Sequence, residues 1–172
     1  MGIEILDIEP QIYVSSDEPK PELIDSIEHR RMHDKKPEGG LWTSTKYQDD
    51  NIVTSAWVDW AEGNLRRYEN NDLNVWELTV DNPCKVLQIN TKNDVIEHSE
   101  KYTDAYQNER HKFDWSYIYE ELDCDAIWLT ETGMVNLVGV LVSDEYSMRS
   151  WDVESMLWSD WKFSSVEKVG SI

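Results

Sequence analysis

The stretch PEGGLWTSTKY, residues 37–47, decides how the rest of the chain is interpreted. Gly39 and Gly40 stand directly before an apolar and aromatic pair, and three hydroxyl residues (43–45) follow in a row. One interpretation is an ordinary hairpin turn that leads into a strand. The other is a strand laid against a ligand, because glycine allows close backbone approach and hydroxyl groups supply hydrogen bonds.

Outward from this stretch, the hydrophobic pattern changes period several times, which predicts mixed α and β structure. We expect strands at 11–16, 40–45, 73–80, 85–90, 126–130, 136–142 and 150–158. We expect helices at 22–34, 51–64, 93–102 and 113–122. The segment 126–130 contains almost no polar residue, so we place it centrally in a sheet. The helices lie between early and late groups of strands, which predicts a single α+β domain over 1–172 with a mostly antiparallel sheet.

The formal net charge of −19 makes duplex nucleic acid a poor partner, because binding it relies on Lys and Arg side chains that displace counterions from phosphates. Acidic residues are concentrated between 113 and 160, where eleven Asp or Glu accompany a single basic residue, Arg149. Three interpretations of this segment stay open. It can be a solvated face that keeps the protein soluble, a docking surface for a basic partner, or a mimic of a nucleic-acid backbone.

The cysteines and histidines do not predict a metal site. Cys84 and Cys124 each stand alone, without the Cys/His spacing that is typical of zinc. His29 and His33 are four residues apart on an expected helix, but no further ligand accompanies them, so we expect a basic, solvated helix face there. No signal peptide is recognisable, and the apolar runs are far shorter than the roughly 20 residues that span a bilayer. We therefore expect a cytoplasmic protein with reduced cysteines and no membrane association.

The late segment SWDVESMLW, 150–158, alternates strictly and carries a candidate catalytic carboxylate. The alternation places Glu154 on the face opposite Val153 and Ser155. Two Trp and a Met flank this glutamate, and apolar surroundings raise the pKa of a carboxyl group. Such a carboxylate can stabilise a cation-like ribose and orient or deprotonate an acceptor, as in glycoside hydrolysis. The alternative is a strand glutamate that faces solvent.

The order of these segments resembles the ADP-ribosyltransferase fold. In that family a first strand supplies a His or Arg, a second strand packs against the nicotinamide end of NAD, and a late strand carries the catalytic glutamate. GGLWTST (39–45) is similar to the second motif, and ESMLW (154–158) is similar to the third. VWELTVDNPCKVLQI (75–89) looks like the family's middle strand pair, and LDCDAIWL (122–129) is similar to the segment before the last strands. The first strand, IYVSS (12–16), departs from the family because it contains neither His nor Arg.

The resemblance implies a split β-sheet core and a mono-ADP-ribosyltransferase that takes NAD as a substrate. Its target would be a macromolecule, such as a basic protein, and phage and toxin members of this fold imply an effector that acts in the cytoplasm of a host cell. In place of the missing His or Arg, we consider Tyr13, Ser15, Ser16 or the basic pair Arg30 and Arg31.

The resemblance also assigns roles to individual residues. Glu154 would be catalytic, and the NAD-binding residues would be Tyr13, Ser15, Trp42, Thr43, Ser44, Thr45 and Trp57. Plain strand and core roles are the alternatives for Ser44 and for the pair Trp57 and Trp60. The rival function is an acidic inhibitor that mimics nucleic acid and occupies a basic partner without catalysis.

Overall fold

The computed structural model describes residues 3–27, 37, 39–49, 52–64, 73–101, 115–138, 148 and 151–172. Its strands are β1 (Glu4–Leu6), β2 (Gln11–Ser15), β3 (Leu41–Thr45), β4 (Tyr47–Asp49), β5 (Ile52–Thr54), β6 (Asn74–Val80), β7 (Cys84–Ile89), β8 (Ala126–Leu129), β9 (Ser155–Trp158) and β10 (Phe163–Ser171). Its helices are α1 (Ala56–Asn64), α2 (Lys92–Lys101), α3 (Trp115–Leu122) and α4 (Glu131–Leu137), and a short 3₁₀ helix spans Pro21–Leu23. The predicted α+β class is confirmed.

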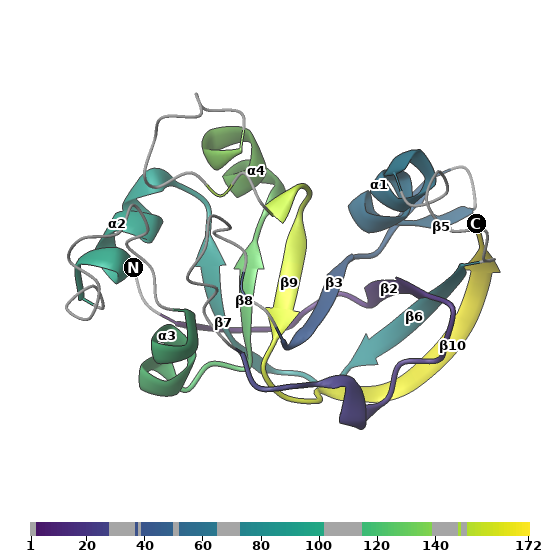
Figure 1. Cartoon of the computed structure of the whole chain (residues 1–172), viewed down its shortest axis with the longest axis horizontal. Coiled ribbons are helices and arrows are strands. Elements are labelled where there is room, and N and C mark those ends of the chain that lie inside the picture. The colour runs from purple at the N-terminus through teal and green to yellow at the C-terminus, as the bar shows by residue number, and fades with distance from the viewer. Residues whose placement is uncertain are drawn as a thin grey trace.

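Eight strands form one sheet in the order β1-β7-β8-β9-β3-β2-β6-β10, and β4 pairs with β5 in a separate hairpin. Among the strands of the described ranges, each neighbouring pair in the large sheet is antiparallel except β7 and β8. The prediction of a mostly antiparallel sheet is therefore confirmed. The β2–β3 junction is short, with Gln11 opposite Thr45 and Ile12 opposite Ser44. Figure 1 shows the β7-β8-β9 side and the β6-β10 side of the sheet turning away from each other across this junction.

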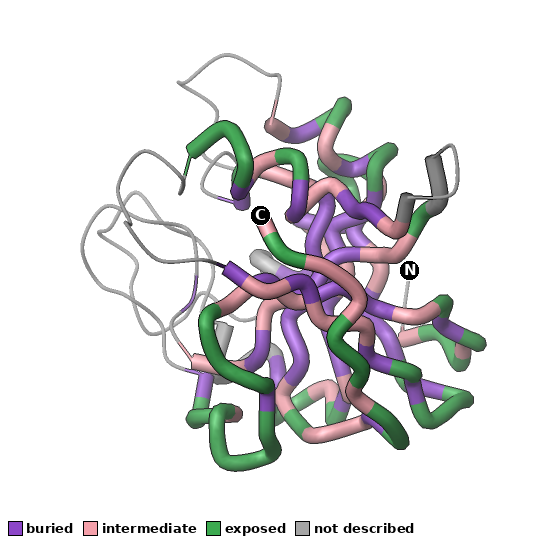
Figure 2. Tube along the Cα trace, turned by 90° about the vertical axis from the view of Figure 1, so that its right-hand side faces the viewer, coloured by how far each residue is buried: buried purple, intermediate pink, exposed green. Residues whose placement is uncertain are grey.

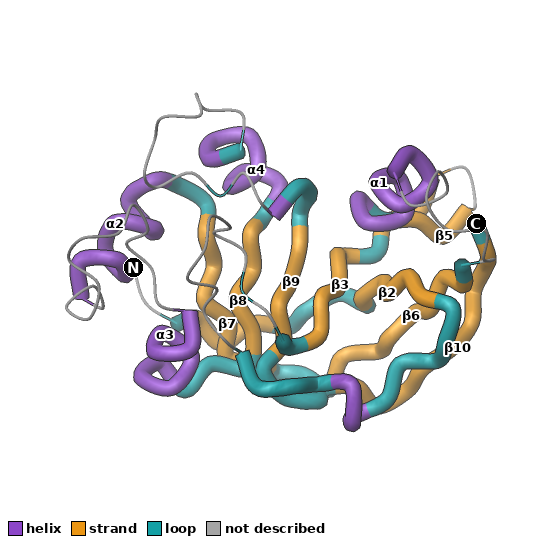
Figure 3. Tube along the Cα trace, in the orientation of Figure 1, coloured by secondary structure: helices purple, strands orange, loops and turns teal. Residues whose placement is uncertain are grey.

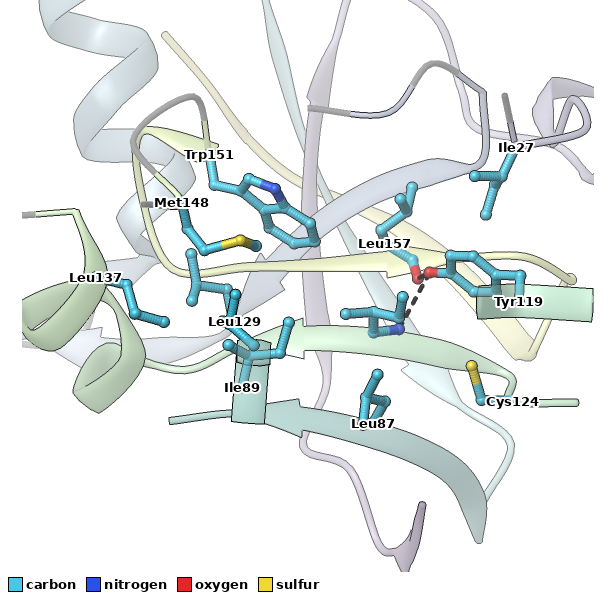
Figure 4. Packing of buried hydrophobic residues seen from close by; sticks show 12 residues of the cluster. Ile27, Leu87, Ile89, Tyr119, Cys124, Leu129, Leu137, Met148, Trp151 and Leu157 are labelled. Atoms are coloured by element: carbon cyan, nitrogen blue, oxygen red, sulfur yellow. Dashed lines mark hydrogen bonds between the residues drawn. The ribbon is translucent and has the colours of Figure 1, made fainter. Parts of the chain in front are cut away.

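Buried side chains gather on both faces of the sheet. Figure 2 shows the buried residues in purple, mostly in the interior of the trace. A first cluster joins α2, α3 and α4 to β7, β8 and β9, and Figure 4 shows it from close by. A second cluster covers the other face of the same strands, and a third packs α1 against β2 and β6. Leu157 belongs to the first cluster, whereas Met156 and Trp158 belong to the second. The predicted alternation of this strand is confirmed between residues 156 and 158.

Tyr119 joins α3 to the two central strands that lie beneath it (Figure 4). Its hydroxyl accepts a hydrogen bond from the Ile127 backbone N–H at 3.1 Å and donates to the Leu157 carbonyl. Ile127 and Leu157 are opposite each other in the β8–β9 ladder. The Tyr119 hydroxyl therefore bridges a backbone N–H of β8 and a backbone carbonyl of β9.

The helix expected over 22–34 is wrong over 24–27, and at its start residues 22–23 belong to the short 3₁₀ helix. Residues 24–27 form neither helix nor strand, and residues 28–34 lie outside the described ranges, as do His29 and His33. The reason is a contact with the glycine turn: the Gly40 N–H donates to the Asp25 carbonyl at 2.9 Å, so this carbonyl is not available to a helix. Tertiary packing of the backbone outweighs the helical spacing of the apolar residues here.

Three other predicted elements differ in their bounds or type. The helix expected over 51–64 begins only at Ala56, because 52–54 pair with 47–49 in the β4–β5 hairpin. The strand expected over 136–142 is wrong at its start, where 136–137 belong to α4; residues 139–142 lie outside the described ranges. The strand expected over 150–158 is present only from Ser155. The segments 73–80 and 85–90 form β6 and β7, but these strands lie in different parts of the sheet and do not pair with each other.

Candidate active site

A pocket of about 360 Å³ opens at one end of the central strands of the sheet. β7 and β8 are parallel, and β9 runs antiparallel to both β8 and β3, so the ends of β7, β8 and β3 meet the start of β9 at this end. Ala56 at the start of α1 and Glu131 at the start of α4 also line the pocket. Figure 3 shows α1 and α4 at this same end of the sheet. The pocket thus joins segments that are far apart in the sequence, as is usual for small-molecule sites.

A tight turn delivers Glu154 to this pocket. Trp151 is fully buried in the first cluster and anchors the start of the turn. Asp152 follows in the left-handed region with a φ of 59°, and the Val153 N–H donates to the Trp151 carbonyl at 2.6 Å. β9 then begins at Ser155. The side chain of Glu154 therefore leaves the chain directly before the strand, at the pocket edge, and is only 5% exposed.

Both strands that flank β9 bind the carboxylate of Glu154. From β3, the Thr45 hydroxyl donates to Oε1 at 2.8 Å and the Thr45 backbone N–H donates to Oε2 at 3.0 Å. From β8, the indole Nε1–H of Trp128 donates to Oε1 at 2.5 Å. The β3–β9 register explains the first contact, because Thr43 lies opposite Met156 and two further steps bring Thr45 opposite Glu154. Three hydrogen bonds thus fix the carboxylate of Glu154 in place. Hydrogen bonds to an ionised carboxylate are stronger than those between neutral groups.

Burial raises the pKa of Glu154 above its ordinary value. The hydrogen bonds from Trp128 and Thr45 act in the opposite direction, because they stabilise the ionised form, and the nearby charge of Glu131 adds to the increase. The net result is a carboxyl group that holds its proton to a higher pH than an exposed glutamate does.

We expect the stability of the wild type relative to Glu154→Gln to fall as the pH rises from the unfolded pKa of Glu through the raised pKa of the folded state. The unfolded pKa of Glu is about 4.3, and a higher pKa in the folded state means that folding binds this proton more tightly. The stabilising contribution is therefore fully present below the unfolded pKa and is lost as the pH rises through the raised folded pKa. Urea unfolding of both proteins over this range measures the difference. A difference that increasingly favours the wild type at higher pH would contradict the raised pKa.

Tyr47 supplies an aromatic wall on the β4 side of the pocket. Its hydroxyl donates to Asp59 Oδ2 of α1 at 2.5 Å, and the Thr54 hydroxyl donates to Asp59 Oδ1 at 3.4 Å. These contacts tie the β4–β5 hairpin to α1. They hold the ring of Tyr47, which is 41% exposed, at the pocket opening.

Amide and hydroxyl groups line the opposite side of the pocket, where β7 and β8 end. The Thr130 hydroxyl donates to Asn90 Oδ1 at 2.6 Å, and Asn90 Nδ2 donates to Gln88 Oε1 at 3.4 Å. Thr130 Oγ1 also accepts the Gly133 N–H at 3.1 Å and so caps α4. Hydrogen bonds connect the polar side chains of this wall, and Thr130 at the start of α4 holds the wall in position.

Of the eight residues that the resemblance assigns, the structure brings Thr45 and Glu154 together at the pocket. Thr43 is buried, donates to Gln11 Oε1 at 2.8 Å and accepts the indole N–H of Trp158 at 2.8 Å. Ser44 is fully buried, and its hydroxyl accepts the backbone N–H of Trp57 at 3.1 Å. These three hydrogen bonds fix β3 to β2, β9 and the start of α1.

The remaining assigned residues lie away from the pocket lining. Trp42 packs edge-on against Trp151 with a centroid distance of 4.7 Å. Trp57 stacks on Trp60 at 4.9 Å. Tyr13 on β2 packs against the second cluster, where burial raises its pKa, and the Ser15 hydroxyl donates to the Asp17 carbonyl. Arg30 and Arg31 are outside the described ranges.

Sequence reasoning missed Trp128, Gln88, Asn90, Thr130 and Glu131 as pocket residues. The signal was present in two places, since the apolar runs of β7 and β8 both end in polar residues, as QIN (88–90) and LTET (129–132). Only the parallel pairing of these strands, which joins segments about 40 residues apart, makes the two ends neighbours.

Within the described part of the chain, no group of three or more His, Cys, Asp or Glu is arranged to hold a metal ion, and no helix is long and apolar enough to cross a membrane. No protein-family model, no curated protein and no solved structure matches this chain.

Proposed function

We propose that this protein is a mono-ADP-ribosyltransferase that uses NAD as a substrate and modifies a protein target, with Glu154 as the catalytic carboxylate. The observation that carries the proposal is the buried Glu154, held by Thr45 at the wall of a small-molecule pocket. A buried acid with a raised pKa and fixed hydrogen bonds in a pocket is typical of a functional site.

The arrangement of β3 and β9 also supports this proposal. The two motifs that resemble the family, GGLWTST (39–45) and ESMLW (154–158), are about 110 residues apart in the sequence and neighbours in the sheet. The last hydroxyl of the first motif, on Thr45, contacts the first residue of the second. A nicotinamide-binding strand and a catalytic glutamate would have to meet in this way.

The chemistry assigned to Glu154 is a substitution at the ribose carbon that bears nicotinamide. The bond between this carbon and the ring nitrogen breaks, its electron pair moves to the nitrogen, and neutral nicotinamide leaves. The carboxylate of Glu154 stabilises the cation-like ribose. A nucleophile of the target then bonds to the same carbon and gives up its proton, which Glu154 is placed to accept.

The pocket suits the nicotinamide ribose half of NAD. Its volume of about 360 Å³ lies near the lower end of small-molecule sites. Among the described residues, its lining contains the carboxylates of Glu131 and Glu154 and no Lys, Arg or His, which favours the positively charged pyridinium ring over the anionic diphosphate. Tyr47 and Trp128 are the aromatic residues of the described lining, and the exposed ring of Tyr47 is the one that we expect to stack on the pyridinium ring.

The experiment that tests this function is an assay of NAD consumption by the purified chain. We expect release of nicotinamide, and covalent addition of ADP-ribose to proteins of a mixed acceptor pool, detected by mass spectrometry. The proposal fails if the protein neither binds NAD nor releases nicotinamide with any acceptor or with water.

An acidic binding protein is the second candidate function, favoured by the exposed carboxylates of Glu120 and Glu121 on α3. Part of the acidic segment is compensated in the fold, because Lys85 pairs with Asp123 at 2.7 Å and Lys162 pairs with Asp125 at 3.0 Å. A chain that consumes no NAD but forms a tight complex with a basic protein, weakened strongly by salt, would have this second function.

A further inference from the structure

Trp128 contacts the candidate catalytic carboxylate from the strand on the other side of β9. Its indole N–H donates to Glu154 Oε1 at 2.5 Å, and its half-buried ring lines the pocket. The β8–β9 register places Trp128 opposite Met156, on the face of the sheet that Glu154 shares. A role in packing alone would require no polar contact, yet the indole N–H of Trp128 is directed at the carboxylate.

The hydrogen bonds divide the two oxygens of Glu154 into different roles. Each oxygen of an ionised carboxylate has two lone pairs. Among the described residues, Oε1 receives two donors, the Thr45 hydroxyl and the Trp128 indole, whereas Oε2 receives only the Thr45 backbone N–H. Oε2 is therefore the oxygen that keeps an acceptor position for a ligand.

An indole is well suited to hold a carboxylate that must exchange a proton. It is a donor only, so it cannot accept the proton from Glu154. It carries no charge, so it does not neutralise the carboxylate as Lys or Arg would. The Thr45 hydroxyl and the indole together restrict the rotation of the carboxylate from two sides.

We propose that Trp128 is a positioning residue that, together with Thr45, holds Oε1 of Glu154 so that Oε2 faces the substrate. The identity of the substrate rests on the proposed function, whereas the orientation of the carboxylate rests on the contacts of Trp128 and Thr45 alone.

The first test is Trp128→Phe, which keeps a large ring and removes the N–H. We expect kcat for NAD consumption to fall about 10-fold with KM nearly unchanged, because a hydrogen bond to a charged group is lost. The low-pH limb of the activity profile should move to higher pH, since the lost donor favours the ionised form of Glu154. The matched control is Trp161→Phe, which removes an indole hydrogen bond of 2.9 Å to the Phe163 carbonyl, outside the pocket lining.

The second test does not depend on NAD. The carboxyl resonance of ¹³C-labelled Glu154 should titrate at a higher pH in Trp128→Phe than in the wild type and in Trp161→Phe. Within the described part of the chain, Glu131 and Tyr47 are the other titratable groups that line the pocket, so the titration is repeated with Glu131→Gln. In the wild type itself, the indole N–H resonance of Trp128 should move with the titration of Glu154.

The outcomes separate this inference from the proposed function. A titration of Glu154 that is unchanged in Trp128→Phe, or an indole resonance of Trp128 that does not follow it, overturns the positioning role. A wild type that consumes no NAD overturns the proposed function, and the titration still decides the role of Trp128. If Trp128→Phe does not fold, the wild-type indole resonance provides the decision.

Discussion

Replacing Glu154 by Gln should lower the rate of NAD consumption about 1,000-fold, through kcat, in a protein that remains folded. The carboxylate supplies the negative charge that a cation-like ribose requires, and an amide of the same shape does not. The hydrogen-bond pattern adds to the loss. If the amide oxygen keeps the Trp128 and Thr45 side chains as donors, the amide NH₂ then faces the Thr45 backbone N–H, which is also a donor.

The measurement is nicotinamide release at saturating NAD, with circular dichroism and urea unfolding to show that the variant is folded. Glu120→Gln is the matched control, because it removes the same charge from an exposed position on α3, outside the pocket lining. It should keep the wild-type rate. A Glu154→Gln protein that retains more than about a tenth of the wild-type rate would exclude Glu154 as the catalytic carboxylate, since general acid–base and electrostatic catalysis contribute at least about 100-fold.

The central strands and two residues of the site, Thr45 and Glu154, could be predicted from the sequence because local sequence patterns indicate them. Alternation or a continuous apolar run identified β3, β8 and the end of β9. Thr45 and Glu154 could be predicted as site residues for the same reason, since each stands at the boundary of such a segment.

The rest of the site depends on which strands become neighbours, and no local pattern encodes that. Gln88 and Trp128 meet Glu154 only because β7, β8 and β9 are adjacent in the sheet. Thr43 and Ser44 have the residue types of a ligand-binding row, but their hydroxyls contact the core and α1. Whether a buried hydroxyl binds a ligand or its own fold is decided by the partner that packs against it.

Gly39→Ala and Gly40→Ala should each destabilise the protein by about 3 kcal/mol. This is a large loss of stability for the addition of a single methyl group. Both glycines have positive φ values, 80° and 64°, which cost a residue with a Cβ about 1–2 kcal/mol. A Cβ on Gly39 would lie 2.1 Å from the Ser26 carbonyl oxygen, and one on Gly40 would lie 2.7 Å from that of Trp158. Relieving such overlap with backbone atoms costs about 1–3 kcal/mol more.

Urea unfolding of these variants tests why the stretch at 37–47 begins with two glycines. Gly63→Ala is the matched control: a Cβ there meets nothing within 4 Å, and the site is an exposed helical position in α1, where Ala is favoured over Gly by about 0.5–1 kcal/mol. The control should therefore be more stable than the wild type and the two variants less stable. Equal stability of all four proteins would mean that the turn adjusts freely. A loss confined to Gly39 and Gly40 would mean that close backbone approach at these positions serves the packing of residues 25–27 and β9 against the start of β3, and so fixes the strand that carries Thr45 to Glu154.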